Sequence, residues 1–214
     1  MDALESRTVN RLYTKLSQSI PNPRSDLVYR NNFELLISVI LSAQATDKSV
    51  NAVTRPLFSN HPTPDRLLEI PLPTLTTLLR PIGLAPTKAK NVRATCEILL
   101  KQHAGQVPGD RVALEKLPGV GRKTASVVLN EGFGQPTIAV DTHVFRVSNR
   151  TGLAPGKNVM ETEKKLIAVT PDRWKKEAHR YLILHGRYVC KAKNFDCSQC
   201  VIVKECSYPD KTDS

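Results

Sequence analysis

The sequence predicts an all-α protein, because helical patterns cover most of the chain and only one short run favours a β-strand. Fifteen prolines are spread along the 214 residues and divide the chain into many short helices. Hydrophobic residues make up 40% and charged residues 24%, an ordinary composition for a folded globular protein. The run that favours a strand, residues 137–140, is too short to be distinguished from a buried loop or a helix entry.

Helical signals begin near the N-terminus and recur along the chain. Residues 7–19 place Val9, Leu12 and Leu16 near helical spacing, and two prolines then end the segment. Residues 33–41, with the sequence FELLISVIL, are apolar on almost every side, which is typical of a buried helix. Hydroxyl caps or first-turn prolines predict helix starts at 63–64 and 86–87, and helical patterns occupy 87–103 and 171–189.

The chain is basic, with 31 lysines and arginines against 20 acidic residues and a formal net charge of +11. The excess is spread over the whole chain, so no basic tail accounts for it. A basic folded protein attracts polyanions, which favours nucleic acid as a partner over a charge that only maintains solubility. No apolar run approaches the roughly 20 residues that span a bilayer, and the N-terminus lacks the pattern of a signal peptide. We therefore expect a soluble protein without a membrane partner.

Four of the five cysteines are clustered near the C-terminus. Their spacing leaves six, two and five residues between successive cysteines, at Cys190, Cys197, Cys200 and Cys206. An odd number of cysteines without a secretory signal argues against a disulfide framework. Both zinc and a [4Fe–4S] cluster accept four cysteines, although zinc modules more often use two C-x2-C pairs. A bound metal is therefore predicted, and its kind stays open on spacing alone.

Residues 117–125, with the sequence LPGVGRKTA, predict a tight turn between two helices. The two glycines allow positive φ angles and let another backbone approach closely. The N–H groups at the start of the second helix form an anion site that suits a DNA phosphate. The residues predicted to contact phosphate are Gly119, Val120, Gly121 and Arg122. The alternative is an ordinary glycine-rich joint that binds no ligand.

Three segments together resemble one known family. LPGVGRKTA is similar to the helix-hairpin-helix of the DNA glycosylase superfamily, and VDTHVFR at 140–146 is similar to the segment that follows it. LSAQATD at 41–47 resembles the endonuclease III branch of that superfamily, as does the cysteine spacing. The chain is thus similar to the endonuclease III family of bifunctional DNA glycosylases and AP lyases, which remove oxidised pyrimidines.

The resemblance implies an architecture of two α-helical domains with DNA in the cleft between them. One is a six-helix barrel over residues 25–135 that contains the hairpin. The other is discontinuous, combines residues 1–24 with 136–214, and holds a [4Fe–4S] cluster. The implied partner is double-stranded DNA that contains damaged pyrimidines or abasic sites. We further expect a monomer in the cytoplasm that associates with the nucleoid, and the short N-terminus favours a prokaryotic enzyme over an organelle-targeted one.

Lys123 lies two residues after the hairpin, at the start of a helix. The positive end of the helix dipole and partial desolvation both disfavour an ammonium there and leave some neutral amine. A neutral amine can attack a sugar carbon and form a Schiff base. An isolated lysine in this place would instead be interpreted as phosphate-binding or solvated. The resemblance implies that Lys123 is the catalytic nucleophile.

Asp141 follows the run 137–140 and precedes a helical pattern, so by itself it is interpreted as an N-cap. The resemblance implies a second role at the reacting nucleotide. There its carboxylate stabilises the positive charge that builds on the sugar as the glycosidic bond breaks. The same carboxylate can help to deprotonate Lys123, and both roles remain open.

Flipping a damaged nucleotide out of the duplex leaves a gap that must be filled. The resemblance implies that Gln44, in LSAQATD, and Leu84, in the segment IGLA, occupy this gap and wedge the strands apart. The alternative for either residue is a surface loop position. The segment 85–87, APT, departs from the aromatic and polar residues of many relatives, which leaves the lesion range open.

For the cysteines, the resemblance selects a structural [4Fe–4S] cluster and keeps zinc as the alternative. Lys191 and Lys193 lie between the first two cysteines. A segment held by metal ligands can present these two cations to DNA phosphates, whereas an ordinary solvated loop would not.

Two other functions account for part of the pattern. A mismatch adenine glycosylase of the same superfamily shares the cysteine cluster, but it generally lacks a lysine at the hairpin position and carries an added C-terminal domain. A non-catalytic helix-hairpin-helix DNA-binding protein with a structural metal would explain the charge, the hairpin and the cysteines. That second alternative gives Lys123 and Asp141 no reason to occur together.

Overall fold

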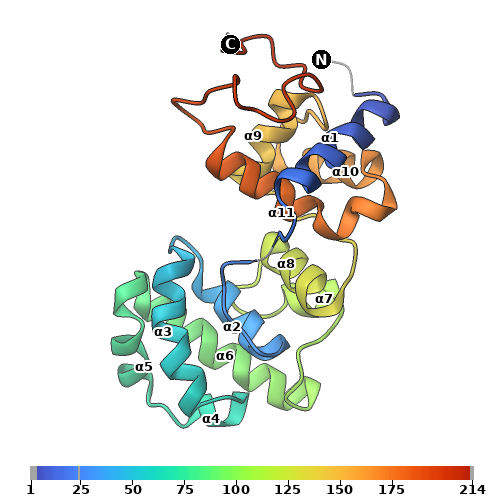
Figure 1. Ribbon diagram of the computed structural model, residues 1–214. Coiled ribbons are helices and arrows are strands. Elements are labelled where there is room, and N and C mark those ends of the chain that lie inside the picture. Colours follow the sequence, from blue (N-terminus) through green and yellow to red (C-terminus); the bar gives the residue numbers. More distant parts are fainter. Residues whose placement is uncertain (1–3, 24, 213–214) are drawn as a thin grey trace. The chain divides into compact units, whose positions relative to one another are not determined.

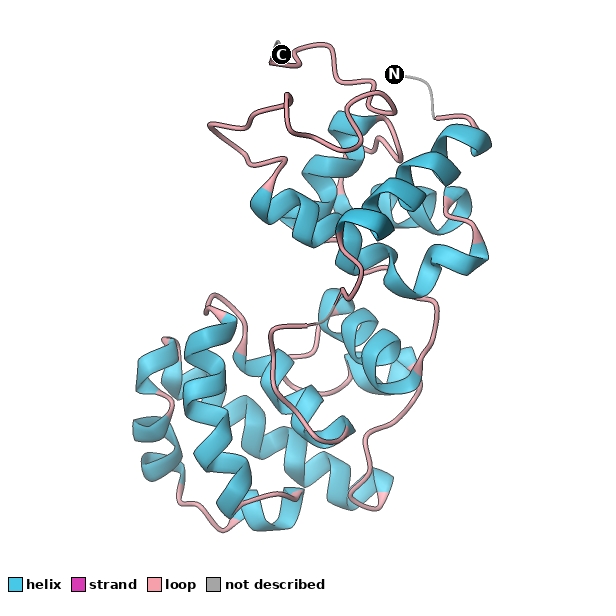
Figure 2. Ribbon diagram, in the orientation of Figure 1, coloured by secondary structure: helices cyan, strands magenta, loops and turns pink. Residues whose placement is uncertain are grey.

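The computed structural model describes residues 4–23 and 25–212, and in these residues all regular structure is helical (Figures 1 and 2). The all-α prediction is confirmed. The helices are α1 (Ser6–Ser19), α2 (Asn32–Leu41), α3 (Asp47–Asn60), α4 (Pro64–Leu68), α5 (Leu72–Leu78), the 3-10 helix η1 (Arg80–Ile82), α6 (Ala85–His103), α7 (Arg111–Glu115), α8 (Arg122–Phe133), α9 (Thr142–Thr151), α10 (Val159–Val169) and α11 (Asp172–Tyr188). Residues 137–140 form no strand and instead carry buried apolar side chains into a core.

The chain divides into two compact units, which we call the hairpin unit and the cysteine unit. The hairpin unit is Ser25–Gly134. The cysteine unit is discontinuous and combines Met1–Arg24 with Gln135–Ser214. Each unit encloses its own cluster of buried apolar side chains, so each has the separate core that defines a domain. Among the described residues, no helix combines the length and apolar character needed to cross a bilayer.

The hairpin unit is built around α2, as its apolar sequence predicts. Nine of the ten α2 residues are buried, and the helix packs against α3, α6 and α8. Asn31 caps its start by accepting a hydrogen bond from the Glu34 N–H at 2.9 Å. The predicted start at Pro64 is confirmed by α4. Helix α6 begins at Ala85, within two residues of its predicted start.

The cysteine unit joins the two ends of the chain. Figure 1 shows α1, in blue, beside α11, in orange, and the two helices are in contact. Helix α1 buries Val9, Leu12 and Leu16 as its spacing predicts, and the hydroxyl of the buried Tyr13 lies 2.9 Å from the Thr170 hydroxyl oxygen. After α11 the described chain continues without a helix to residue 212, drawn as a loop in Figure 2.

Candidate functional site

Helices α7 and α8 form a helical hairpin joined by residues 116–121. Gly119 has φ +82°, and a Cβ there would lie 2.9 Å from the Asn91 Nδ2 atom, so both the conformation and the space require glycine. The hydroxyl of Thr95 donates to the Pro118 carbonyl at 3.2 Å and fixes the turn to α6. The hairpin predicted from LPGVGRKTA is therefore present.

The second glycine of the hairpin has a different role from the one we predicted. Gly121 has φ −93°, so the expectation of a positive φ is correct for Gly119 and wrong for Gly121. Gly121 is instead the N-cap of α8 and supplies no capping side chain. A Cβ at this position would meet nothing within 4 Å. The absence of a side chain keeps the start of α8 open to an anion.

Lys123 is the second residue of α8 and is exposed. The chain's own atoms therefore do not bury this side chain, and the expected partial desolvation is wrong for the protein without DNA. The geometry gives a lysine amine that extends from the same turn as the predicted phosphate site.

Asp141 is the N-cap of α9, as its position in the sequence predicts. Its Oδ1 atom accepts hydrogen bonds from the His143 N–H at 2.9 Å and the Val144 N–H at 2.8 Å. Two N–H donors on one oxygen fix the direction of the carboxylate. Asp141 belongs to the cysteine unit and Lys123 to the hairpin unit, so neither unit by itself contains the pair.

Gln44 and Leu84 both lie in exposed loops of the hairpin unit. Their φ angles are +54° and +52°, in the left-handed region that side chains other than glycine rarely adopt. Such conformations cost about 1–3 kcal/mol each and are concentrated at functional sites. Only four described non-glycine residues have positive φ, and two of them are these predicted site residues. The helices next to their loops, α3 and η1, are in contact.

The four clustered cysteines line one small cavity of about 30 Å³ in the cysteine unit. Among the described residues, no three potential ligands lie close enough together to form a ready metal site. Burial raises the pKa of Cys200 to about 11 and also raises that of Cys206, with a smaller contribution from the neighbouring cysteines. Bare thiolates are thus disfavoured here. A cation among them would offset both burial and mutual repulsion, so the donor set fits a metal.

Arg150, at the end of α9, holds residues 190–206, which we call the cysteine segment. The sequence analysis missed this arginine. Its guanidinium donates to the Lys191 carbonyl at 2.7 Å and the Ala192 carbonyl at 3.3 Å, and one Nη lies 3.6 Å from the Cys190 Sγ. The same guanidinium lies over the ring of Phe195 at 4.2 Å. These partners are about 40 residues away in the chain, and no local pattern marks such an arginine.

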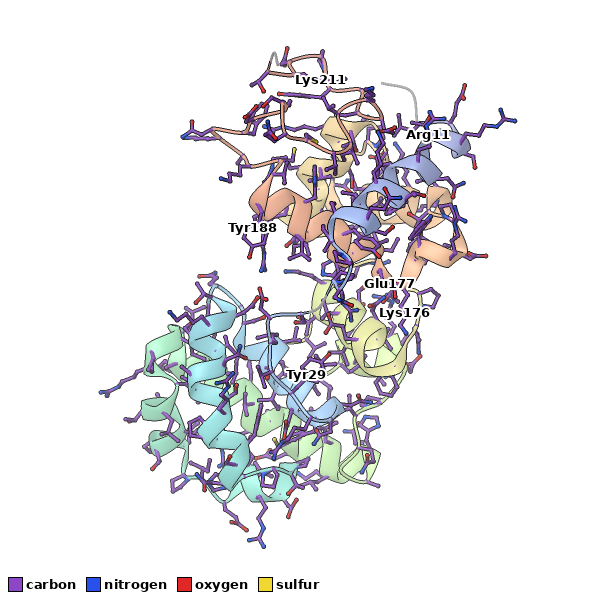
Figure 3. All side chains as sticks on the ribbon, viewed as in Figure 1. Arg11, Tyr29, Lys176, Glu177, Tyr188 and Lys211 are labelled. Carbon is purple, nitrogen blue, oxygen red and sulfur yellow. The ribbon has the colours of Figure 1, made fainter. Side chains whose placement is uncertain are left out.

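Two other residues near the cysteines were also missed. His185 is buried, with Nε2 3.7 Å from the Cys200 Sγ, and burial lowers its pKa to about 4, so the ring is neutral. Tyr188, at the end of α11, has 64% of its surface exposed, and Figure 3 shows its side chain projecting away from the helix. The available signal was the segment HGRY at residues 185–188, which one residue separates from Cys190. Lys191 and Lys193 are exposed, as predicted.

Comparison with known proteins connects these features. The family profile of the HhH-GPD superfamily of base excision DNA repair proteins matches residues 37–171. Endonuclease III of Escherichia coli K12 is 53% identical over 202 residues, which are 94% of this chain and 96% of that protein. Endonuclease III of Rickettsia conorii is 50% identical over 205 residues, with 96% and 98% covered. The chain belongs to the endonuclease III family.

Solved structures agree with this membership. A trapped covalent intermediate of an endonuclease III with DNA matches with a TM-score of 0.89 and 43% identity, over 95% of this chain and 96% of that one. A thermostable thymine-DNA glycosylase matches with a TM-score of 0.85 at 22% identity, which shows the fold alone. As a member of the endonuclease III family, the chain is a base excision repair enzyme, a DNA glycosylase and AP lyase. The family is one whose members carry a [4Fe–4S] cluster.

Proposed function

We propose that this enzyme binds duplex DNA, removes oxidised pyrimidines, and cleaves the strand 3′ to the resulting abasic site by β-elimination through a Schiff base on Lys123. The observation that carries this proposal is the position of Lys123, exposed in the first turn of α8, two residues after Gly121, an N-cap without a capping side chain. A phosphate held at that helix start places a nucleotide beside the lysine amine. A related endonuclease III, 43% identical, has been trapped covalently on DNA.

The proposed chemistry begins with the neutral Lys123 amine. Its nitrogen attacks C1′ of the flipped nucleotide, and the bond from C1′ to the base breaks, with the electron pair leaving on the base. The nitrogen then gives one proton to the departing base and one to O4′ as the sugar ring opens, which leaves an imine between Nζ and C1′. Loss of a C2′ proton to solvent forms a C2′–C3′ double bond and expels the 3′ phosphate with the electron pair of the C3′–O bond. Water then adds to the imine carbon, which becomes an aldehyde and releases the lysine amine.

Asp141 has the complementary role in this proposal. Its carboxylate stabilises positive charge on the sugar while the base departs. Because Oδ1 is fixed by the two N–H donors of α9, the carboxylate loses little further freedom when it meets the substrate. We assign Gln44 and Leu84 to the gap left by the flipped nucleotide, on the basis of their exposed left-handed loops.

The cysteine cavity is proposed to hold a [4Fe–4S] cluster, with zinc as the alternative. Cys190, Cys197, Cys200 and Cys206 would be its ligands. When bound, the metal supplies cross-links for residues 190–206, a segment without a helix. Arg150 then fixes the carbonyls of residues 191–192, so that Lys191 and Lys193 are presented to DNA phosphates.

The proposal also covers the state and place of action of the enzyme. Each unit closes its own core, and the chemistry needs only one chain and DNA, so we propose a monomer in the bacterial cytoplasm, associated with the nucleoid. Sedimentation with and without a lesion duplex measures the oligomeric state directly, and a dimer as the active species would contradict the proposed monomer.

Borohydride trapping on DNA tests the central step, because the reagent reduces an imine to a stable covalent bond. Lys123→Gln should still bind an abasic duplex but should lose trapping and strand cleavage. The matched control is Lys116→Gln, which removes an exposed lysine just before the same turn and should trap normally. Undiminished trapping by Lys123→Gln would mean that another amine is the nucleophile. Absence of trapping in the unaltered chain would favour a non-catalytic DNA-binding protein.

A further inference from the structure

Lys88 is a buried lysine that the reaction does not use. It lies in the first turn of α6, and only 3% of its surface is exposed. Burial lowers its pKa, and the positive end of the helix dipole also disfavours a cation in a first turn. No carboxylate among the described residues forms an ion pair with it. A lysine ammonium that is buried, lies at the positive end of a helix and has no counter-charge is costly, so its presence requires a specific reason.

The partner of Lys88 identifies that reason. Its Nζ donates to the carbonyl of Ile82 at 2.7 Å. Ile82 is the last residue of η1, and its side chain is itself buried. The terminal carbonyl of a helix has no partner within the helix, so the lysine satisfies this acceptor from the next element of the chain.

This hydrogen bond from Lys88 to Ile82, which we call the tie, closes a loop of only two exposed residues. Gly83 has φ +66° and ψ 166°, and Leu84 has φ +52° and ψ 25°, so consecutive residues adopt positive φ. The residues on either side, Ile82 and Ala85, are both buried. Gly83 and Leu84 alone therefore connect two buried residues, and Leu84 is left 52% exposed.

We propose that Lys88 is the positioning residue for Leu84: by holding the Ile82 carbonyl, it keeps the strained loop in the conformation that projects Leu84 toward DNA. This inference rests on the proposed function of Leu84 as a wedge. A lysine serves here because its long side chain reaches from the first turn of α6 to the Ile82 carbonyl, to which its ammonium donates. An apolar residue of the same length would fill the space without the bond.

The test uses Lys88→Met, which keeps most of the length of the side chain and removes the donor. Its matched control is Lys90→Met, which removes an exposed lysine from the same helix. Two duplexes of one sequence are compared under single-turnover conditions, one with thymine glycol and one with a preformed abasic site. Lys88→Met should slow release of thymine glycol by about tenfold, since misplacement on the order of 1 Å can cost about 100-fold. Cleavage at the abasic site should change far less, and Lys90→Met should keep the ratio of the two rates.

A double variant separates positioning from general destabilisation. If Lys88 acts through Leu84, Lys88→Met combined with Leu84→Ala should be no slower on thymine glycol than the slower single variant. Effects that multiply, or an equal loss on both duplexes, would overturn the inference. Gly83→Ala supplies a second route if Lys88→Met folds poorly, because it strains the same loop at φ +66° where a Cβ meets nothing within 4 Å.

Hydrogen exchange in the protein without DNA separates this inference from the proposed function. Lys88→Met should speed exchange of the Gly83 and Leu84 amides, whereas Lys90→Met should not. Unchanged exchange would overturn the tie itself. Faster exchange combined with normal thymine glycol release in both Lys88→Met and Leu84→Ala would keep the tie but overturn its purpose, and with it the wedge role of Leu84.

Discussion

The hairpin and the cysteine segment are both predicted to contact phosphate, but they are held in place by different means. The turn at 116–121 is fixed by its neighbours in the chain and by close packing at Gly119, whose missing side chain leaves room for Asn91 and Ile40. The cysteine segment has no helix, and its one fully buried apolar side chain is Ile202. It depends on contacts from far away, such as Arg150, and on the proposed cluster. One site is preformed by packing, whereas the other requires cross-links.

Removal of one cluster ligand should therefore have the largest effect, and only in the cysteine segment. Cys200→Ser should abolish the yellow-brown absorbance and the bound iron, about four per chain in the unaltered protein. Because structural metal sites contribute on the order of 10 kcal/mol to folding, residues 190–212 should become susceptible to proteolysis. The core of the hairpin unit, with its own apolar cluster, should stay protected.

The control for this experiment is Cys96→Ser, which alters the buried cysteine of α6, outside the cluster. It should lower stability by a modest amount and keep both iron and absorbance. A colourless Cys200→Ser variant with normal protection of residues 190–212 would show that Arg150 and the other protein contacts suffice. A fully active unaltered protein that carries one zinc would replace the cluster assignment.

An effect of intermediate size is expected on stability when the two glycines of the hairpin are replaced one at a time by alanine. Gly119→Ala forces a side chain into φ +82° and to 2.9 Å from Asn91 Nδ2, so it should destabilise the hairpin unit by at least about 1–2 kcal/mol. This corresponds to a fall in melting temperature of about 2–8 °C for a chain of this size. Gly121→Ala has open space and φ −93°, so it should lower the melting temperature less, only by the modest cost of an alanine at an N-cap.

The same pair distinguishes packing from binding. The methyl group of Gly121→Ala projects where the proposal places a phosphate, so this variant should lose DNA affinity while losing less stability than Gly119→Ala. Differential scanning calorimetry and equilibrium binding to an abasic duplex measure the two effects separately. Normal affinity of Gly121→Ala would place the phosphate elsewhere, and normal stability of Gly119→Ala would mean that Asn91 and Ile40 yield easily.

The difference between the two regions also explains what the sequence could predict. The hairpin, the caps and the buried α2 are local patterns, so glycine spacing and apolar runs were sufficient to predict them. The predicted positive φ of Gly121 was wrong, because the motif shows that a small residue is needed but does not show for which reason. Arg150, His185 and Lys88 could not be predicted, since each acts on a partner that only the folded chain brings near. The exposure of Lys123 likewise depends on tertiary packing.

The smallest expected effect is on DNA affinity, and it shows how the cysteine segment and the hairpin unit each contribute to binding. If Lys191 and Lys193 contact phosphates, replacing both by Ala should flatten the slope of log affinity against log salt by up to about 1.8, at about 0.9 for each contact. Lesion-bearing and undamaged duplexes should weaken alike, because phosphate contacts carry no information on the base. Gln44→Ala should instead keep the slope and slow thymine glycol release more than abasic cleavage, which needs less unstacking.

These two variants are matched in that each removes exposed polar side chains from a loop, but from different units. Because the cysteine segment is held by Arg150 through its backbone carbonyls, the lysine replacements leave that support intact, and any change in slope reports the lost charges. A lysine pair that altered only lesion discrimination, together with a Gln44 variant that altered only the salt slope, would reverse the assignment. The region held by cross-links would then select the lesion, and the preformed region would hold the DNA backbone.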